Sequence, residues 1–206
     1  MTGPQTSRPH DVRAFFGARA AGWDAKFPDD GPAYAGGVAA LRLREGQRVL
    51  DAGCGTGRAL TALRTAVGPG GTVLGADLTP EMLAAAVRAG RDACAGLLLA
   101  DVTRLPLPSA ALDAVFAAGL VSHLADSAAG LAELAELARV VRPGGRLALF
   151  HPVGRAALAA RKGHPLTPDD LRAEPNLRPL LADSGWDLVQ YVDEDDRYLA
   201  LAVRQG

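Results

Sequence analysis

The sequence has only two cysteines, Cys54 and Cys94, among its 206 residues. They form neither a disulfide framework nor a metal-ligand spacing, so we expect no metal site. The chain also lacks an apolar run of the about 18 residues that a membrane helix requires. Its first ten residues are polar, without the apolar segment of a signal peptide. We therefore expect a cytoplasmic protein with no membrane partner.

An excess of one charge is also missing. The 22 Lys and Arg residues are balanced by 23 Asp and Glu residues, which gives a formal net charge of −1 and a pI near 6.4. A nucleic-acid-binding surface requires a basic excess, so we expect no nucleic-acid partner. The length and the 49% hydrophobic content suffice for one domain with a large core, as a monomer or homodimer.

A glycine-rich turn between a strand and a helix is the most informative stretch. An apolar run ends in Asp51, and glycine then alternates with small residues at Gly53, Gly55 and Gly57. Glycine allows positive φ and lets a ligand approach the main chain closely. The amides that open the following helix favour an anionic group. The order strand, turn, helix predicts the first half of a βαβ unit.

The turn lacks the glycine that a nicotinamide-dinucleotide site requires. That fingerprint places a third glycine three residues after a G-x-G pair, where this chain has Arg58 or Leu60. An NAD(P)-dependent oxidoreductase is therefore the less favoured interpretation.

Acidic residues close three successive predicted strands, at Asp51, Asp77 and Asp101. The carboxyl ends of parallel strands meet at one edge of the sheet, where such folds bind ligands. Asp77 follows Gly57 by 20 residues, the distance at which an acid accepts hydrogen bonds from ribose hydroxyls. The alternative is that Asp77 only opens the helix that follows it.

Further elements follow from periodicity and turn residues. Leucines every three residues predict a helix over 127–141, with Leu131 and Leu134 facing the core and Glu133 and Glu136 facing solvent. The Pro-Gly-Gly stretch 142–146 predicts a turn after it. A short loop of four acids makes the last two strands antiparallel. The further expected strands are 72–77, 96–101, 112–118, 147–151, 186–192 and 197–203.

The pattern D-x-G-x-G-x-G that begins at Asp51 resembles the first motif of the class I S-adenosylmethionine-dependent methyltransferases. The small-molecule type, of the ubiquinone/menaquinone-biosynthesis-like group, fits best. The stretch Leu137–Phe150, with its Arg-Pro-Gly-Gly, is similar to a late motif of that family. The resemblance covers about residues 38–151. It implies a Rossmann-like α/β three-layer sandwich with a seven-stranded sheet of order 3-2-1-4-5-7-6, mostly parallel with an antiparallel last strand.

The same resemblance implies S-adenosyl-L-methionine as the cofactor. The acid at Asp51 would hold its ammonium group, and Asp101 with the amide of Val102 would read its adenine. Met82 would touch the adenine, or else belong to the core. The implied cofactor-binding residues are Asp51, Gly53, Cys54, Gly55, Gly57, Asp77, Leu78, Met82, Asp101, Val102 and Ala118.

A general base is needed only if the acceptor must lose a proton during methylation. His123, in the loop after the fourth strand, is the first candidate, because a neutral imidazole accepts a proton near pH 7. His151, at the end of the fifth strand, is the second. The alternative for both is a packing or hydrogen-bonding role.

The predicted function is methyl transfer to a small-molecule acceptor, with O-, N- and C-methylation left open. Residues 1–206 would form one methyltransferase domain. Its parts would be an N-terminal lid at 1–37, a cofactor-binding core at 38–150, and an acceptor-side segment with the closing strand pair at 151–206. A non-catalytic or regulatory S-adenosylmethionine-binding protein is the alternative, since no catalytic residue is fixed by the sequence.

Overall fold

The computed structural model describes residues 9–26, 30–120, 127–163 and 165–206. The strands are β1 Arg48–Ala52, β2 Thr72–Asp77, β3 Gly96–Leu99, β4 Leu112–Ala118, β5 Val141–His151, β6 Trp186–Glu194 and β7 Arg197–Arg204. The α-helices are α1 Pro9–Gly17, α2 Gly31–Ala40, α3 Leu60–Val67, α4 Pro80–Arg88, α5 Ser127–Val140, α6 Arg155–Lys162 and α7 Glu174–Asp183. Short 3-10 helices are η1 Ala20–Gly22, η2 Asp24–Lys26 and η3 Arg91–Ala93.

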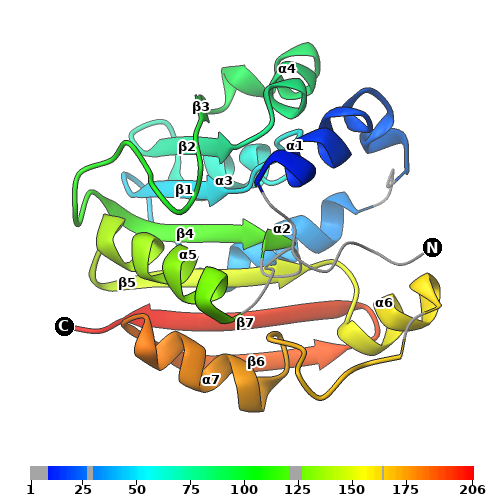
Figure 1. Cartoon of the computed structure of the whole chain (residues 1–206). Coiled ribbons are helices and arrows are strands. Elements are labelled where there is room, and N and C mark those ends of the chain that lie inside the picture. The colour runs from blue at the N-terminus through cyan, green and yellow to red at the C-terminus, as the bar shows by residue number, and fades with distance from the viewer. Residues whose placement is uncertain (1–8, 27–29, 121–126, 164) are drawn as a thin grey trace.

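The strands form one sheet of order β3-β2-β1-β4-β5-β7-β6 (Figure 1). β1 to β5 pair in parallel, and β7 runs antiparallel to both β5 and β6. The predicted fold class and strand order are therefore confirmed. The carboxyl ends of β1, β2 and β4 lie at one edge, which positions the glycine turn and the loops around it.

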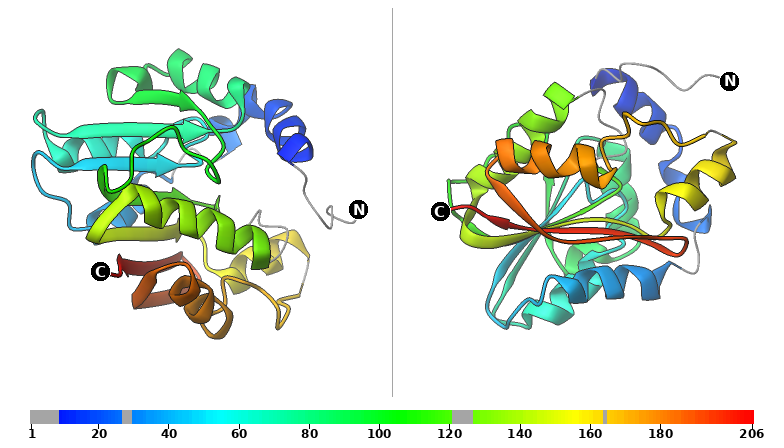
Figure 2. Two further views of the ribbon diagram at one scale, coloured as in Figure 1. Left: turned by 60° about the vertical axis from the view of Figure 1, so that its left-hand side comes forward. Right: turned by 90° about the horizontal axis from the view of Figure 1, so that it is seen from below.

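Helices cover both faces of the sheet. Figure 2 shows α5 and α7 on one face and α2 and α3 on the other. Each face has its own buried cluster: Leu134 and Leu177 belong to the first, and Leu41 and Leu63 to the second. Strands buried on both faces carry near-continuous apolar runs, which is why β1 and β4 are recognisable in the sequence. Within the described ranges, no helix has both the length and the apolar composition to cross a bilayer.

Two predicted boundaries differ from the structure. β3 ends at Leu99, so Asp101 lies in the following loop and does not close the strand. β5 begins at Val141, which pairs with Leu112, and the register then shifts so that Ala114 pairs with Arg146. The residues between Val141 and Arg146 are therefore an irregularity within the strand, because Val141 is already held in the sheet.

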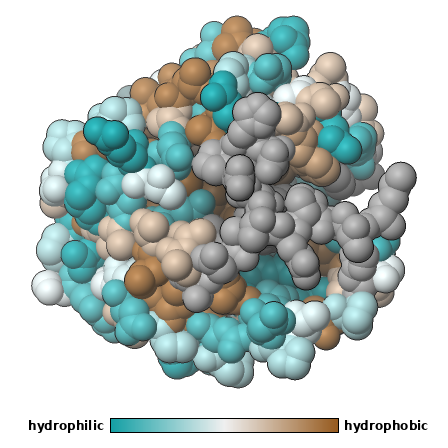
Figure 3. Space-filling view, viewed as in Figure 1, coloured by the Kyte–Doolittle hydropathy of each residue, from teal (hydrophilic) through white to brown (hydrophobic). Residues whose placement is uncertain are grey.

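The orientation predicted for α5 is wrong at Leu131, Glu133 and Glu136. The Glu136 side chain is only 13% exposed, and its Oε1 accepts a hydrogen bond from the Leu105 amide at 2.7 Å. Leu131 is 39% exposed, and Figure 3 shows apolar residues gathered over this helix on the outer face. Glu133 instead points inward, and its Oε2 atom is buried. A three-residue step drifts away from the 3.6-residue turn of a helix, so Glu133, four residues before the buried Leu137, shares its face.

Candidate cofactor and acceptor site

The glycine turn has the backbone conformation that its sequence indicates. Gly53, Gly55 and Gly57 have φ values of +68°, +54° and +83°, which strain any residue with a Cβ atom. A Cβ atom at Gly57 would lie 2.7 Å from Leu60 Cδ1, whereas one at Gly55 would meet nothing within 4 Å. Gly55 therefore leaves open space beside the main chain.

Asp51 lies at the end of β1, immediately before this turn. Its side chain is 1% exposed, and Oδ1 is buried with no hydrogen-bond partner. Burial, and second the negative charge of Asp77, raise the pKa of Asp51 to about 8. A buried carboxylate without a partner is costly. A cationic group bound at this point would offset that cost, so the ammonium of an amino acid fits here.

Asp77 ties the end of β2 to the glycine turn. Its Oδ2 accepts a hydrogen bond from the Gly55 amide at 2.8 Å, and Oδ1 accepts one from the Thr79 amide at 2.8 Å. Burial raises the pKa of Asp77, and these two hydrogen bonds oppose the rise. Each carboxylate oxygen has a further lone pair for a ligand hydroxyl. The bond to Thr79 shows that Asp77 also opens α4, so the two interpretations of this acid are compatible.

The residues expected to contact the adenine offer few free side-chain groups. Asp101 Oδ1 accepts hydrogen bonds from the amide and the hydroxyl of Thr103, at 2.9 and 2.7 Å. The side chains of Met82 and Val102 are 2% and 8% exposed, and Val102 packs in the core cluster of the α5 face. For Val102, the backbone amide is therefore the group left to contact a ligand.

Glu133 of α5 belongs to this neighbourhood and was missed by sequence reasoning. Burial, and second the charge of Asp101, raise the pKa of Glu133 to about 8. The spacing of four residues to Leu137 was the signal that could have placed it on the inner face.

The N-terminal segment is bound to the outer side of the glycine turn. The Asp24 carboxylate accepts hydrogen bonds from the Thr56 hydroxyl and from Arg91 Nη1, both at 2.6 Å. A second ion pair joins Asp30 to Arg58 at 3.3 Å. Residues before the first strand thus lie directly against the predicted cofactor loop.

Aromatic packing adds to this attachment on the second face of the sheet. The Tyr34 ring of α2 packs edge-on against Phe150 of β5 at 5.5 Å between centroids. The Arg58 guanidinium lies 5.3 Å from the centroid of the same ring. Burial raises the pKa of Tyr34 to about 12, so this phenol stays protonated and neutral.

A second group of residues lies beyond the carboxyl ends of β4 and β5. A small cavity of about 10 Å³ opens there, lined by Gly119, Leu120, Phe150, His151, Arg172 and Tyr198, among others. Ala118, the last residue of β4, lies beside it in the chain and is half-buried. This position is next to the glycine turn across β1 and β4, where an acceptor would meet a bound cofactor.

His151 is the candidate base that the structure describes. Its Nδ1 lies 2.8 Å from the Val153 carbonyl oxygen and 3.1 Å from the Val153 amide nitrogen. Burial lowers the pKa of His151, and the charges of Arg172 and Lys162 lower it further. The imidazole is therefore neutral at pH 7 and able to accept a proton. His123 lies outside the described residues.

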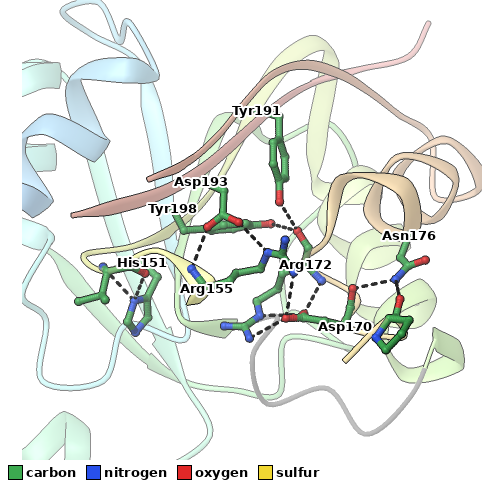
Figure 4. A network of polar contacts seen from close by, with 10 residues as sticks. His151, Arg155, Asp170, Arg172, Asn176, Tyr191, Asp193 and Tyr198 are labelled. Carbon is green, nitrogen blue, oxygen red and sulfur yellow. Dashed lines mark hydrogen bonds and ion pairs between the residues drawn. The ribbon is translucent and has the colours of Figure 1, made fainter. Parts of the chain in front are cut away.

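Figure 4 shows the polar network that surrounds this second group. Arg155 donates from Nε to Asp193 at 3.0 Å and from Nη1 to Asp170 at 3.3 Å. Arg172 donates from Nε and Nη2 to the two oxygens of Asp170, both at 3.0 Å. The Tyr198 hydroxyl donates to the Arg172 carbonyl at 3.1 Å. In the part of the chain that the structure describes, no group of three or more His, Cys, Asp or Glu side chains could hold a metal ion.

Comparison with known proteins agrees with the turn and the strand order. Residues 50–149 match the family model described as a methyltransferase domain. The matched residues thus form a methyltransferase domain, and this part of the chain is similar to the ubiquinone and menaquinone biosynthesis methyltransferases. The cofactor of that family is S-adenosylmethionine.

Two curated relatives and one solved structure illustrate the match. Malonyl-[acyl-carrier protein] O-methyltransferase of Serratia marcescens is 41% identical over 113 residues, which are 55% of this chain and 41% of the relative. Demethylmenaquinone methyltransferase of Thermus thermophilus is 41% identical over 106 residues, 50% of this chain and 46% of the relative. The chain thus spans less than half the length of either.

The solved structure is magnesium protoporphyrin IX methyltransferase of Synechocystis PCC 6803 with bound SAH. It superposes with a TM-score of 0.71 at 19% identity, over 96% of this chain and 99% of the other. At this identity the comparison shows that the two proteins share a fold.

Proposed function

We propose that this protein transfers the methyl group of S-adenosylmethionine to a small-molecule acceptor. The observation that carries the proposal is Asp51, a fully buried carboxyl whose Oδ1 has no partner beside a glycine turn with open space at Gly55. An α-ammonium group at that point would satisfy the carboxylate. The absence of a third glycine, and the antiparallel β6–β7 pair, argue against a nicotinamide cofactor.

In this proposal the chain holds the cofactor along the edge of β1, β2 and β4. Asp51 binds its ammonium group, Asp77 its ribose hydroxyls, and the Val102 amide its adenine. The residues assigned to the cofactor are Asp51, Gly53, Cys54, Gly55, Gly57, Asp77, Leu78, Met82, Asp101, Val102 and Ala118.

The chain contributes position more than chemistry. When bound, the cofactor supplies an electrophilic methyl group on a sulfonium. In-line displacement requires the acceptor atom to be aligned with that methyl, so the walls around His151 and Tyr198 act by orientation. Where the acceptor must lose a proton, neutral His151 is the described group that takes it. His123 stays a candidate base on sequence grounds.

Three parts of the chain divide the task. Residues 38–150 bind the cofactor, residues 1–37 cover it, and residues 151–206 bind the acceptor. The attachment of Asp24 to Thr56 and Arg91 supports the covering role. The names of the relatives, which concern a malonyl thioester carrier, a quinone precursor and a porphyrin, support an organic acceptor. Monomer or homodimer stays a prediction.

Calorimetric titration with S-adenosylmethionine, and separately with NAD, tests the proposal. Micromolar binding of the sulfonium compound without NAD binding is expected, and Asp77→Ala should abolish it. Binding of NAD alone would contradict the cofactor assignment. Turnover with a panel of organic acceptors then separates an enzyme from a regulatory S-adenosylmethionine-binding protein.

A further inference from the structure

A second cavity, of about 200 Å³, lies between the last turns of α6 and the segment that follows it. Its lining includes Leu158, Lys162, Leu166, Asp170 and Arg172. Arg172 also lines the small cavity at the ends of β4 and β5. Arg172 is therefore part of the lining of both cavities, and a ligand in the larger one would lie next to the smaller one.

The charges of the lining do not cancel. Asp170, the carboxylate in the wall, is already bound by Arg155 and by Arg172. The second partner of Arg155 is Asp193, so these two arginines and two aspartates balance one another. Lys162 makes no ion pair with any described residue. The cavity thus keeps one uncompensated positive charge.

The positive potential extends inward to His151. The charges of Arg172 and Lys162 both lower the pKa of this imidazole, after the larger effect of burial. The hydrogen bond to the Val153 backbone, second to burial in size, and the charge of Asp30, the smallest contribution, raise the pKa instead. Side chains on α6 and on the segment before α7 therefore act on the same point at the end of β5.

The remaining lining of the cavity is apolar apart from Thr167. Leu158, Ala159 and Pro165 line it, and Leu166 is 43% exposed there. The volume is below the about 300–1,000 Å³ of complete ligand pockets, so it suits one part of an acceptor. A cationic group beside apolar walls matches a ligand with an anionic group on an apolar body.

We propose that the methyl acceptor carries an anionic group, a carboxylate or a phosphate, which Lys162 and Arg172 bind in this cavity. Its apolar part packs against Leu158 and Leu166 and leads past Arg172 toward His151. The assignment rests on the proposed methyltransferase function, because it places the acceptor relative to the cofactor.

Lys162 also has a structural role open to it, since a cation in the last turn of α6 stabilises the helix dipole. Arg161 lies in the same turn but does not line the cavity. Arg161→Met and Lys162→Met therefore form a matched pair. Both remove a cation from the helix end, and only Lys162→Met removes one from the cavity.

The test uses full-length protein loaded with S-adenosylhomocysteine. Benzoate, phenyl phosphate and the neutral isostere benzamide are titrated as probes by calorimetry. We expect one of the two anions to bind at least tenfold more tightly than benzamide. Lys162→Met should remove at least tenfold of that affinity, and Arg161→Met less than twofold. The preferred anion identifies the acceptor group as carboxylate or phosphate.

Three results would overturn the inference: equal affinity for benzamide and the anions, no binding of either anion, or equal losses in the two variants. Binding of S-adenosylmethionine is measured on the same preparations. If the cofactor binds and the anions do not, only this inference fails. If the cofactor itself does not bind, the proposed function fails.

Discussion

The turn after β1 and the segment between β5 and β7 reach the same edge of the sheet, but they are held in different ways. At the turn, main-chain amides of Gly55 and Thr79 donate to Asp77, and Asp51 has an oxygen without a partner. In the segment, arginine side chains pair with aspartates, as Arg172 does with Asp170. The turn leaves a buried carboxylate oxygen without a partner, whereas the arginine–aspartate network of the segment pairs its own charges and leaves Lys162 outside it.

The turn is therefore the region that can contribute free energy to cofactor binding, and the segment is the region that contributes to the stability of the fold. An unpaired buried acid destabilises the empty protein, so a cationic ligand gains by pairing with it. The paired arginines and aspartates instead hold α6, the segment before α7 and β6 together. We expect substitutions at the turn to act mainly on cofactor affinity, and substitutions in the arginine–aspartate network to act mainly on folding.

Among the substitutions that compare the two regions, the largest effect is expected at Asp51. Asp51→Asn should weaken S-adenosylmethionine binding by about 100-fold or more, because it removes one charge of a buried pair. The same change should stabilise the empty protein at alkaline pH. Calorimetry and thermal unfolding measure the two effects.

The direction with pH follows from the pKa of Asp51, which is about 8 in the folded protein and about 3.9 in an unfolded chain. Between these two pKa values the folded state retains a proton that the unfolded state has released. The wild type therefore loses stability as the pH rises from about 4 to about 8. The variant should unfold at least about 4 °C above the wild type at pH 8 and level with it near pH 4. An unchanged cofactor affinity would contradict the role of Asp51.

Arg155→Met should have the second largest effect, and it should act on stability alone. It leaves Asp193 without its cationic partner and Asp170 with Arg172 alone, and these side chains are 17% and 12% exposed. We expect a loss of about 2 kcal/mol in unfolding free energy, below the range for fully buried pairs. Affinity for S-adenosylmethionine should change less than twofold. A large loss of cofactor affinity would show that the two regions are not separate.

Gly55→Ala should lower cofactor affinity about tenfold while costing about 1 kcal/mol of stability from its positive φ. Gly144→Ala is the matched control. Gly144 also has positive φ, +73°, and its Cβ atom would likewise meet nothing within 4 Å. We expect urea unfolding to show the same loss of stability in both variants. Calorimetry should show a loss of cofactor affinity in Gly55→Ala alone. Equal affinities would mean that the space beside Gly55 is not used.

The smallest effect is expected at the N-terminal attachment. Asp24→Asn removes the partner of Arg91, and the Asp24 side chain is 39% exposed, so about 0.5 kcal/mol is at stake. Cofactor affinity should fall about twofold and lose part of its salt dependence. Asp92→Asn, at an exposed acid of η3, should leave both unchanged. The same salt dependence in both variants would argue against a covering role for this segment.

The turn and the strands could be predicted because each depends on local signals, whereas the strand order and the cofactor class followed from the family resemblance that those signals carry. Positive φ requires glycine at Gly53, Gly55 and Gly57, and strands buried on both faces require apolar runs. These signals lie within a few residues of one another in the chain. The roles of individual site residues stay predictions, Asp51 and Asp77 among them.

The acceptor side was not predictable in the same way. Arg155 pairs with Asp193 across 38 residues, and many other acids in the chain carry the same charge. The network appears only when α6, the segment before α7 and β6 are folded together. The prediction for Glu133 was wrong for a different reason. It placed apolar residues at every third position of α5, and this spacing assigned the buried Glu133 to the solvent-facing side.

The antiparallel pairing of β5 and β7 has a consequence for how such a protein changes. His151 and Tyr198 are directly opposite each other in that pair, so the chain leaves the inner sheet and rejoins it at nearly the same point. The two ends of the stretch between His151 and Tyr198 are therefore held next to each other by the sheet. Exchange of this stretch for one of another length and composition would leave β1 and its turn in place, so under the proposed function we expect the acceptor to change without a change of cofactor.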